Sequence, residues 1–531
     1  MGTTSTISLI LNGHIPFIKE EADPQAPQKY WLYNLLYETL IPLLQTFDRL
    51  EGDRIPFKLG IVFSPLLIQQ LQDPALIESF IQFLDAKIEL GEREVNRTRD
   101  IPWMNHLAHT YYDRAIEYRV LFTERYEKNV IRAFDIYQKK GKVEILATAA
   151  TYAFLPFYTS YPEAIKAQIE VALKTYREAF GRFPEGFWLP EAGWNPELDE
   201  ILRSYGFSYT VVDTHGLLQG HPIPQEGTFQ PVRTPAGLKV LARNLALSRA
   251  VWDAHEGYPT HACYREYYWD IGYELPREDM KAFVASDGSR QQTGYKYWAV
   301  TGGEGEKQPY IPQDAHGQIQ KDVDAFVELC ESHLDTYRRL REKEGCLVGA
   351  YNLDLFGHRW YEGIDFLETF FREVAQRSSF VVDTPAHVCA HFPQEKLEEV
   401  MPEFSSWGEN GFGETWLNSS NDWMYPPVLK ITEKMIELAE RFPNDGGLKE
   451  RTLNQAAREV LLAQASDWAS MLHYQQAVEY ARHMVESCVD NFSIIYESLG
   501  GNYISTEWLT QLEKRHAIFP DINYRIFRKK R

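Results

Sequence analysis

The chain has 531 residues, of which 44% are hydrophobic and 24% charged; this ordinary globular composition excludes the disordered and fibrous classes. Lys and Arg total 55 against 75 for Asp and Glu, so the net charge is −20. Because such an acidic surface repels a phosphate backbone, we expect no nucleic-acid partner.

Cysteine usage and the N-terminal segment indicate the cellular compartment. The five cysteines are far apart and form no Cys-x-x-Cys pair, so neither a disulfide framework nor a cysteine zinc site is predicted. The N-terminal sequence MGTTSTISLILNGH lacks the basic and long apolar regions of a signal peptide, and no stretch of 18 apolar residues occurs elsewhere. We therefore expect a cytoplasmic protein with no membrane partner.

Short β-rich segments recur along the first 400 residues, and most of them end in small or polar residues. The segments expected as strands are 7–14, 58–64, 143–152, 186–194, 209–216, 347–357 and 379–384. Helix-like stretches separate most of them; in 162–180, for example, apolar residues recur at helical spacing. This alternation predicts an α/β fold with a parallel sheet that is buried on both faces.

Two regions break the alternation. The stretch at about 217–303 is rich in Pro, Gly, aromatic and charged residues, and we expect an insert there because long irregular segments in compact domains are usually functional. Residues 403–427 are rich in Trp, Gly and Asn, and the pattern beyond about residue 428 is helical. The sequence therefore predicts an α/β domain over 1–400, with that insert, and a C-terminal α-helical domain over 401–531.

Polar residues gather at the C-terminal ends of the predicted strands, where the active sites of parallel barrels lie. They are His14, Thr151, Glu191, Asp213, His215, Asp354 and Asp383. Loops at strand ends are polar in any fold, but a histidine or carboxylate at most of the ends exceeds that expectation. The sequence thus favours a site at this end of the sheet.

Glu191 is the first candidate catalytic residue, since it follows a strand and is flanked by Trp188 and Trp194. A carboxylate among indoles is poorly solvated and costly to keep charged unless it is paired or used. Such a group suits glycoside chemistry, in which one carboxylate attacks the anomeric carbon and a second group protonates the leaving oxygen. A structural Glu bonded to an Arg or to backbone amides is the alternative.

The second group is expected on another strand end, in the segment YNLDLFGHRWYEG at 351–363. Asn352 and Asp354 are two residues apart and would face the same side of a strand. His14, His215, Glu191 and Asp354 could suggest a metal site, but no His-x-x-x-His or His-x-His spacing supports one. We expect neither a metal nor another cofactor.

Taken together, these segments resemble glycoside hydrolase family 57, and most closely its α-1,4-glucan branching enzyme group. The motifs that carry the resemblance are NGHIPF, ATAATYAFLP, GFWLPEAGW, VVDTHGL, WDAHEGYP, YREYYWDIGYEL, GYKYWAVTG and LFGHRWYEG, followed by a Trp-rich segment. They occur in order over most of the chain, which is far more specific than any single short pattern.

The resemblance implies a distorted (β/α)7 barrel with a small inserted region and a C-terminal α-helical domain that lends tryptophans to the cleft. It further implies a retaining enzyme that acts on α-glucans such as glycogen, starch and maltooligosaccharides, with Glu191 as nucleophile. The residues that would shape the sugar subsites are His14, Trp31, Tyr152, Trp188, Asp213, His215, Trp269, His358, Trp407 and Trp416. Tyr152 stands where the family commonly has His.

The chain departs from the family at the acid/base position, since Asn352 stands where the catalytic Asp is expected and Asp354 where a Glu is expected. An amide cannot donate a proton as a general acid. Three interpretations are open: an engineered Asp-to-Asn substitution at 352, a transfer of the role to Asp354, or a natural glucan-binding protein that has lost catalysis.

Specificity is the second open question. Phe229 lies in the part of the insert where branching enzymes carry a tyrosine-bearing loop over the acceptor side, and this chain lacks that tyrosine. An α-glucan hydrolase, either amylase-like or acting on α-1,6 bonds, is therefore the alternative to a branching enzyme.

Overall fold

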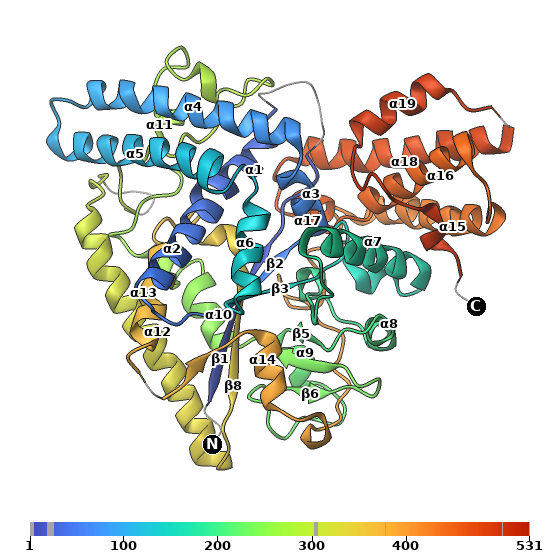
Figure 1. The fold of residues 1–531 in the computed structure, drawn as a ribbon, viewed down its shortest axis with the longest axis horizontal. Coiled ribbons are helices and arrows are strands. Elements are labelled where there is room, and N and C mark those ends of the chain that lie inside the picture. The colour runs from blue at the N-terminus through green and yellow to red at the C-terminus, as the bar shows by residue number, and fades with distance from the viewer. Residues whose placement is uncertain (1–4, 19–25, 302–305, 378, 502, 530–531) are drawn as a thin grey trace.

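The computed structural model describes residues 5–18, 26–301, 306–377, 379–501 and 503–529. Figure 1 shows parallel strands at the centre of the larger part of the molecule, with helices packed around them. The helices near the C-terminus form a separate bundle beside that part. Among the helices described, none combines the length and apolar content needed to cross a membrane.

Parallel strands from two sheets make a distorted barrel. One sheet has the order β3-β2-β1-β8 and the other the order β4-β5-β7-β6. A parallel bridge between Ala147 and Phe187 joins the sheets on one side, and on the other the Asn244 N–H donates to the Val348 carbonyl at 2.7 Å. The parallel barrel strands are β1 (Thr6–Gly13), β2 (Leu59–Phe63), β3 (Val143–Leu146), β4 (Gly186–Phe187), β5 (Tyr209–Val212), β7 (Lys239–Ala242) and β8 (Cys346–Asn352).

Every segment predicted as a strand contains one, but the set of barrel strands differs from the prediction. The segment 379–384 contains only β9 (Val381–Val382), which pairs with the first residues of β1. Strand β7 takes its place and pairs with β5 in parallel, although it lies within 217–303, where we expected only an insert. It lies in a region rich in Pro, Gly and charged residues, where the alternation of strands and helices that identified the other segments is absent. The two-residue strand β6 (Val232–Arg233) pairs antiparallel with β7.

Helices cover the outside of the barrel. They are α1 (Lys29–Asn34), α2 (Ile41–Gly52), α3 (Pro65–Leu71), α4 (Pro74–Arg97), α5 (Pro102–Val120), α6 (Val130–Lys139), α7 (Pro162–Phe180), α8 (Leu198–Ser204), α9 (Thr214–Leu218), α10 (Leu245–Trp252), α11 (Ile271–Glu274), α12 (Pro312–Arg341), α13 (Gly363–Val374) and α14 (Pro385–His391). A π-helical turn, Leu35–Leu40, joins α1 to α2.

Helix α7 shows why these elements form where they do. Its apolar stripe, which includes Ile165, Ile169 and Tyr176, is buried against the barrel. Pro162 occupies the first turn, where no backbone N–H is needed, and Gly181 ends the helix in the left-handed conformation with φ 65°. The predicted helix over 162–180 is confirmed.

The C-terminal bundle consists of α15 (Tyr425–Arg441), α16 (Gly447–Ala463), α17 (Ser466–His473), α18 (Val478–Gly501) and α19 (Thr506–Arg515). The helical pattern expected beyond about residue 428 is interrupted between α16 and α17. At this break Ala465 forms a β-bridge with Ala153, and the Ser466 N–H donates to the Tyr152 carbonyl at 3.3 Å. The break therefore brings the first turn of α17 to the ends of the barrel strands.

Candidate active site

A cavity of about 420 Å³ opens at the C-terminal ends of the barrel strands. Glu191 reaches it from the turn after β4, and Asn352 reaches it from the end of β8. Helix α10 contributes Trp252, while the segment between the barrel and the bundle contributes Trp407 and Trp416. Four residues predicted from the sequence thus line one cavity: Glu191, Asn352, Trp407 and Trp416.

Glu191 is held in place by residues from the C-terminal third of the chain. Its backbone is left-handed, with φ 59°, a conformation that costs a non-glycine residue about 1 kcal/mol or more. The Trp407 N–H donates to the Glu191 carbonyl at 2.9 Å, and the Trp407 indole donates to its carboxylate at 2.7 Å. The Ser466 hydroxyl donates to the second carboxylate oxygen at 3.0 Å. Neutral donors orient this carboxylate, and no Arg ion pair to it occurs among the described residues.

Burial raises the pKa of Glu191 to about 7, although the hydrogen bond from Trp407 opposes the shift. The nearby Asp467 carboxylate acts in the same direction as burial. A carboxylate that ionises near neutral pH in a cavity is a common feature of catalytic sites. This carboxylate is therefore mainly ionised only above neutral pH.

Asn352 lies beside Asn12 because β1 and β8 are paired in parallel with these two residues in register. The Asn12 side-chain N–H donates to the Asn352 carbonyl oxygen at 3.1 Å. A carboxylate at position 352 could accept the same hydrogen bond, so the surroundings fit an acid as well as an amide.

Asp354 has a different environment. It lies in the short turn Leu353–Leu355, where its carboxylate accepts a hydrogen bond from the Arg359 guanidinium at 3.0 Å. The Arg359 backbone N–H also donates to the Asp354 carbonyl at 3.1 Å. Asp354 is absent from the described residues that line the cavity. The Asp354 carboxylate is therefore bound to the Arg359 guanidinium. For Asp354 to transfer a proton to substrate in the cavity, this ion pair would have to break.

His14, Tyr152 and Trp188 form a connected group next to Glu191. The His14 ring stacks on Tyr152 with centroids 4.1 Å apart, and its two nitrogens contact the Ser64 hydroxyl at 2.8 Å and the Asp467 carboxylate at 2.9 Å. The Tyr152 hydroxyl oxygen accepts hydrogen bonds from the Asn12 side chain at 2.7 Å and the Trp188 indole at 3.1 Å. Tyr152 thereby connects β1, whose Asn12 bonds Asn352, to the segment after β4 that carries Glu191.

We expect Tyr152→Phe to lower the melting temperature, because two buried N–H donors lose their acceptor at a cost of about 1–3 kcal/mol. Differential scanning calorimetry measures this. The control is Tyr268→Phe, since Tyr268 is 77% exposed and its hydroxyl is not needed by a buried donor. Equal melting temperatures for the two variants would contradict the bridging role of the Tyr152 hydroxyl.

Sequence reasoning missed Ser466 and Asp467, which bind Glu191 and His14. Both lie in the region where only a helical pattern was predicted, and the structure places them in the first turn of α17. Ser and Asp are preferred where helices begin, so the Ser-Asp pair at 466–467 was the available signal. Their contacts with Glu191 and His14 span 275 and 453 residues and have no signature in sequence spacing.

Other predicted site residues lie outside the cavity lining, as far as the described residues show. Asp213 pairs with Arg243, which does line the cavity, and the His215 ring contacts the Gly411 carbonyl at 2.6 Å. Trp31 packs edge-on against Tyr480. Trp269 is 44% exposed beneath Lys307, and His358 contacts Glu38 and Tyr267.

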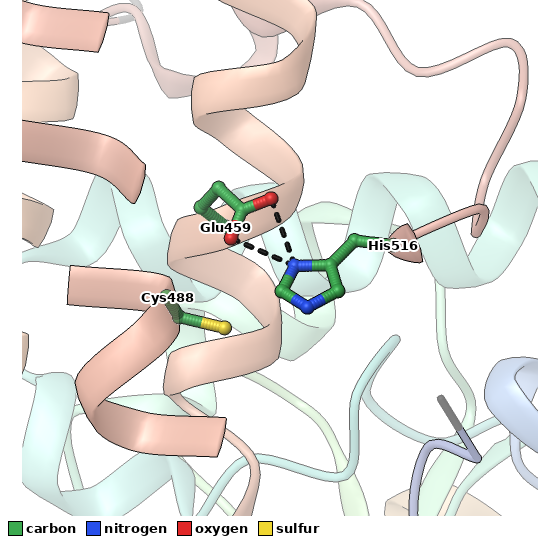
Figure 2. A group of neighbouring side chains, drawn as sticks. All are labelled: Glu459, Cys488 and His516. Carbon is green, nitrogen blue, oxygen red and sulfur yellow. Dashed lines mark hydrogen bonds and ion pairs between the residues drawn. The ribbon is translucent and has the colours of Figure 1, made fainter. Parts of the chain in front are cut away.

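Glu459, Cys488 and His516 form the group of metal-ligating residue types that Figure 2 shows inside the C-terminal bundle. The His516 ring contacts both Glu459 carboxylate oxygens at 2.8 and 2.9 Å, and the Gln455 and Asn491 side chains donate to the same carboxylate. Glu459 is thus fully engaged by protein donors. The arrangement is that of a buried, hydrogen-bonded His–Glu pair inside the bundle.

Comparisons with known proteins assign the family. The family model described as Glycosyl hydrolase family 57 matches residues 8–402. The chain belongs to glycosyl hydrolase family 57. A second model, described as the C-terminal part of 1,4-alpha-glucan branching enzyme, matches residues 428–527.

Similar proteins within the family differ in activity. A 1,4-alpha-glucan branching enzyme of Thermococcus kodakarensis is 28% identical over 90% of this chain and 71% of its own length. An α-amylase of Thermotoga maritima superposes with a TM-score of 0.93 at 32% identity, covering 100% of both chains. A family 57 branching enzyme of Pyrococcus horikoshii superposes with a TM-score of 0.87 at 27% identity, covering 99% of this chain and 97% of that one. The distorted (β/α)7 barrel and the helical C-terminal part agree with these structures.

Proposed function

We propose that the cavity binds α-1,4-glucan and that Glu191 is the nucleophile of a retaining glycosyl transfer, with Asn352 at the acid/base position. The observation that carries the proposal is the buried Glu191 carboxylate, which shares one cavity with Asn352, Trp407 and Trp416. In this proposal residues 1–400 form the catalytic unit, and residues 401–531 complete its cleft.

The chemistry assigns a separate role to each group. A Glu191 oxygen attacks the anomeric carbon, the bond to the glycosidic oxygen breaks, and that oxygen must gain a proton as it leaves. The donors of Trp407 and Ser466 keep the carboxylate oriented for the attack. Asn352 cannot supply the proton, so the step with a natural glucan is expected to be slow in this chain.

Tryptophans supply the surfaces for the sugar rings. Trp252 is 40% exposed and lies 5.7 Å from Trp407 between ring centroids, which gives an aromatic edge at the mouth of the cavity. The Trp416 indole nitrogen is buried and has no hydrogen-bond partner among the described residues. A sugar hydroxyl could accept from it. These features suit a neutral polysaccharide.

Branching is the finer proposal, and it is supported by the match of residues 428–527 to the branching enzyme C-terminal model. Transfer to a second glucan requires the glycosyl intermediate to survive until a sugar hydroxyl replaces water. Phe229 packs flat on Tyr337, with centroids 4.6 Å apart, so it does not cover the acceptor side. The similarity to an α-amylase supports hydrolysis as the second candidate.

A donor with a leaving group that needs no proton tests the roles of Glu191 and Asn352 together. We expect the chain to release fluoride from α-maltotriosyl fluoride in the first turnover at least about 10²-fold faster than it cleaves amylose, because a positioned general acid contributes about that much or more to the first step. Fluoride release and new reducing ends are measured. The control Glu191→Gln should lose the fluoride reaction. Glucan binding without any fluoride release would instead support the non-catalytic alternative.

A further inference from the structure

A second cavity, of about 550 Å³, lies apart from the Glu191 cavity, and the two share no lining residue. It is bordered by the π-helical turn Leu35–Leu40 and by helices α2, α5 and α13, of which α2 and α13 lie side by side (Figure 1). Its tyrosines are Tyr37, Tyr111, Tyr118, Tyr295 and Tyr361. Rings and hydroxyl groups thus make up much of its wall.

Besides Arg49 and Arg372, three Lys or Arg side chains line this cavity, each from a different part of the chain. The Arg265 guanidinium lies 3.5 Å from the Tyr361 ring centroid and donates to the Gly294 carbonyl at 3.2 Å. The Arg114 guanidinium, from α5, donates to the Tyr361 hydroxyl. Lys87, from α4, donates to the Thr293 carbonyl at 2.5 Å. Lys87 and Arg265 are only 2% and 5% exposed, so their charges are poorly hydrated.

The carboxylates of the cavity are already neutralised by other groups. Glu38 contacts His358 and lies 3.7 Å from Arg265. Glu368 pairs with Arg49 at 2.6 Å and Arg372 at 2.8 Å.

Two acidic groups remain at the rim. Asp365 and Glu117 are both exposed, so solvent screens their charges. Glu117 accepts a hydrogen bond from Gln45 at 2.7 Å. Among the residues that the structure describes, neither Lys87 nor Arg114 forms an ion pair with a carboxylate, although the chain as a whole is strongly acidic.

We propose that this cavity binds a phosphoryl anion, either inorganic phosphate or a phosphate monoester, through Lys87, Arg114 and Arg265. Lys87 is a buried cation with no carboxylate partner among the described residues, which is costly, and the partly buried Arg114 also lacks one; an anion with several acceptor oxygens would compensate both charges. The guanidinium fork matches the geometry of phosphoryl oxygens, and a Lys ammonium adds a point charge. The volume is within the range of small-molecule sites, which leaves room for the organic part of an ester.

Isothermal titration calorimetry on the full chain tests the site with inorganic phosphate and with glycerol 3-phosphate, and glycerol serves as the uncharged comparison. We expect both phosphates to bind and glycerol not to bind. Tighter binding of glycerol 3-phosphate would identify a monoester site, and equal or tighter binding of inorganic phosphate a site for the free ion. Because the readout is phosphate binding, its failure would leave the proposed glucan activity untouched.

Arg114→Gln is expected to weaken phosphate binding about 10- to 100-fold, as removal of one charge-assisted hydrogen-bonding partner predicts. The matched control is Arg119→Gln on the same helix, because Arg119 pairs with Asp85 at 2.8 Å and does not line the cavity. Thr369→Trp, which narrows the cavity and removes no charge, should also block binding and covers the case in which Arg114→Gln does not fold. Absence of phosphate binding to the parent chain, or equal binding by all three variants, would overturn the proposal.

Discussion

Asn352→Asp is expected to raise the rate of glycosyl transfer from amylose by about 10²- to 10⁴-fold, the contribution of a positioned general acid. The substitution replaces the side-chain NH2 group by an oxygen and keeps the shape of the side chain. The Asn12 N–H that donates to Asn352 at 3.1 Å can donate to a carboxylate in the same way, so the fold should tolerate the change. The expected gain therefore reflects chemistry and not repair of packing.

The matched comparison is Asp354→Asn, made in the parent and in the Asn352→Asp background. We expect little effect on the glucan rate in either background, because Asp354 is paired with Arg359 outside the cavity lining. A large loss in the parent, together with no gain from Asn352→Asp, would move the acid role to Asp354.

Products of the Asn352→Asp variant decide between the two candidate activities. Amylose is incubated with the variant, and α-1,6 linkages and new reducing ends are measured in the same samples. Branching predicts α-1,6 linkages with few new reducing ends. Reducing ends without any α-1,6 linkage would replace the branching proposal with hydrolysis.

Hydrophobic periodicity in the sequence predicted the helices and strands whose own residues determine their conformation. The stripe of α7 and the apolar run of β1 lie in segments long enough for their periodicity to be read. Strand β7 lies in a region rich in Pro and Gly, and its pairing with β5 follows from closure of the barrel, which no local pattern encodes. Local patterns therefore predicted the α/β class with a parallel sheet, the family resemblance implied the barrel, and one barrel strand was misassigned.

For the Glu191 cavity, too, residues within motifs were predictable, whereas contacts that depend on tertiary packing were not. Glu191 and Asn352 were found because each belongs to a motif at a strand end, and Trp407 and Trp416 belong to a Trp-rich segment. Which tryptophans reach the carboxylate depends on the path of that segment across the barrel, and Trp31 and Trp269 lie elsewhere. The contact of Ser466 with Glu191 depends on the docking of the C-terminal bundle.

Glu191→Gln in the Asn352→Asp background is expected to lower glucan transfer by a factor on the order of 10³ or more, since deletion of a covalent nucleophile is among the most severe catalytic losses. In the active background, the rate should rise with pH through about 7, because burial raises the pKa of Glu191 to about 7 and the attack requires the ionised form. If the residual rate of Glu191→Gln rose with pH through about 7 in the same way, the nucleophile role of Glu191 would be contradicted.

The same substitution should stabilise the fold at high pH. Below the ordinary pKa of 4.5, Glu191 is protonated in both folded and unfolded chains, so it causes no loss of stability there. Between 4.5 and about 7 only the unfolded chain ionises, and the free energy of unfolding falls with rising pH until the folded group also ionises. Glutamine stays neutral, and the Ser466 hydroxyl can accept from its amide as readily as it donates to the carboxylate.

We therefore expect Glu191→Gln to unfold at the parent's temperature near pH 4 and at a higher temperature above pH 7, with a gain of about 1–3 kcal/mol. The control is Glu144→Gln: burial also raises the pKa of Glu144 to about 7, but its partners are Tyr209 and the Ala386 N–H, and it does not line the Glu191 cavity. It should show the same pH-dependent gain in stability and retain glucan transfer. Calorimetry across pH and the transfer assay together separate the two roles: loss of activity with no gain in stability above pH 7 would mean that the Glu191 carboxylate ionises without penalty in its cavity.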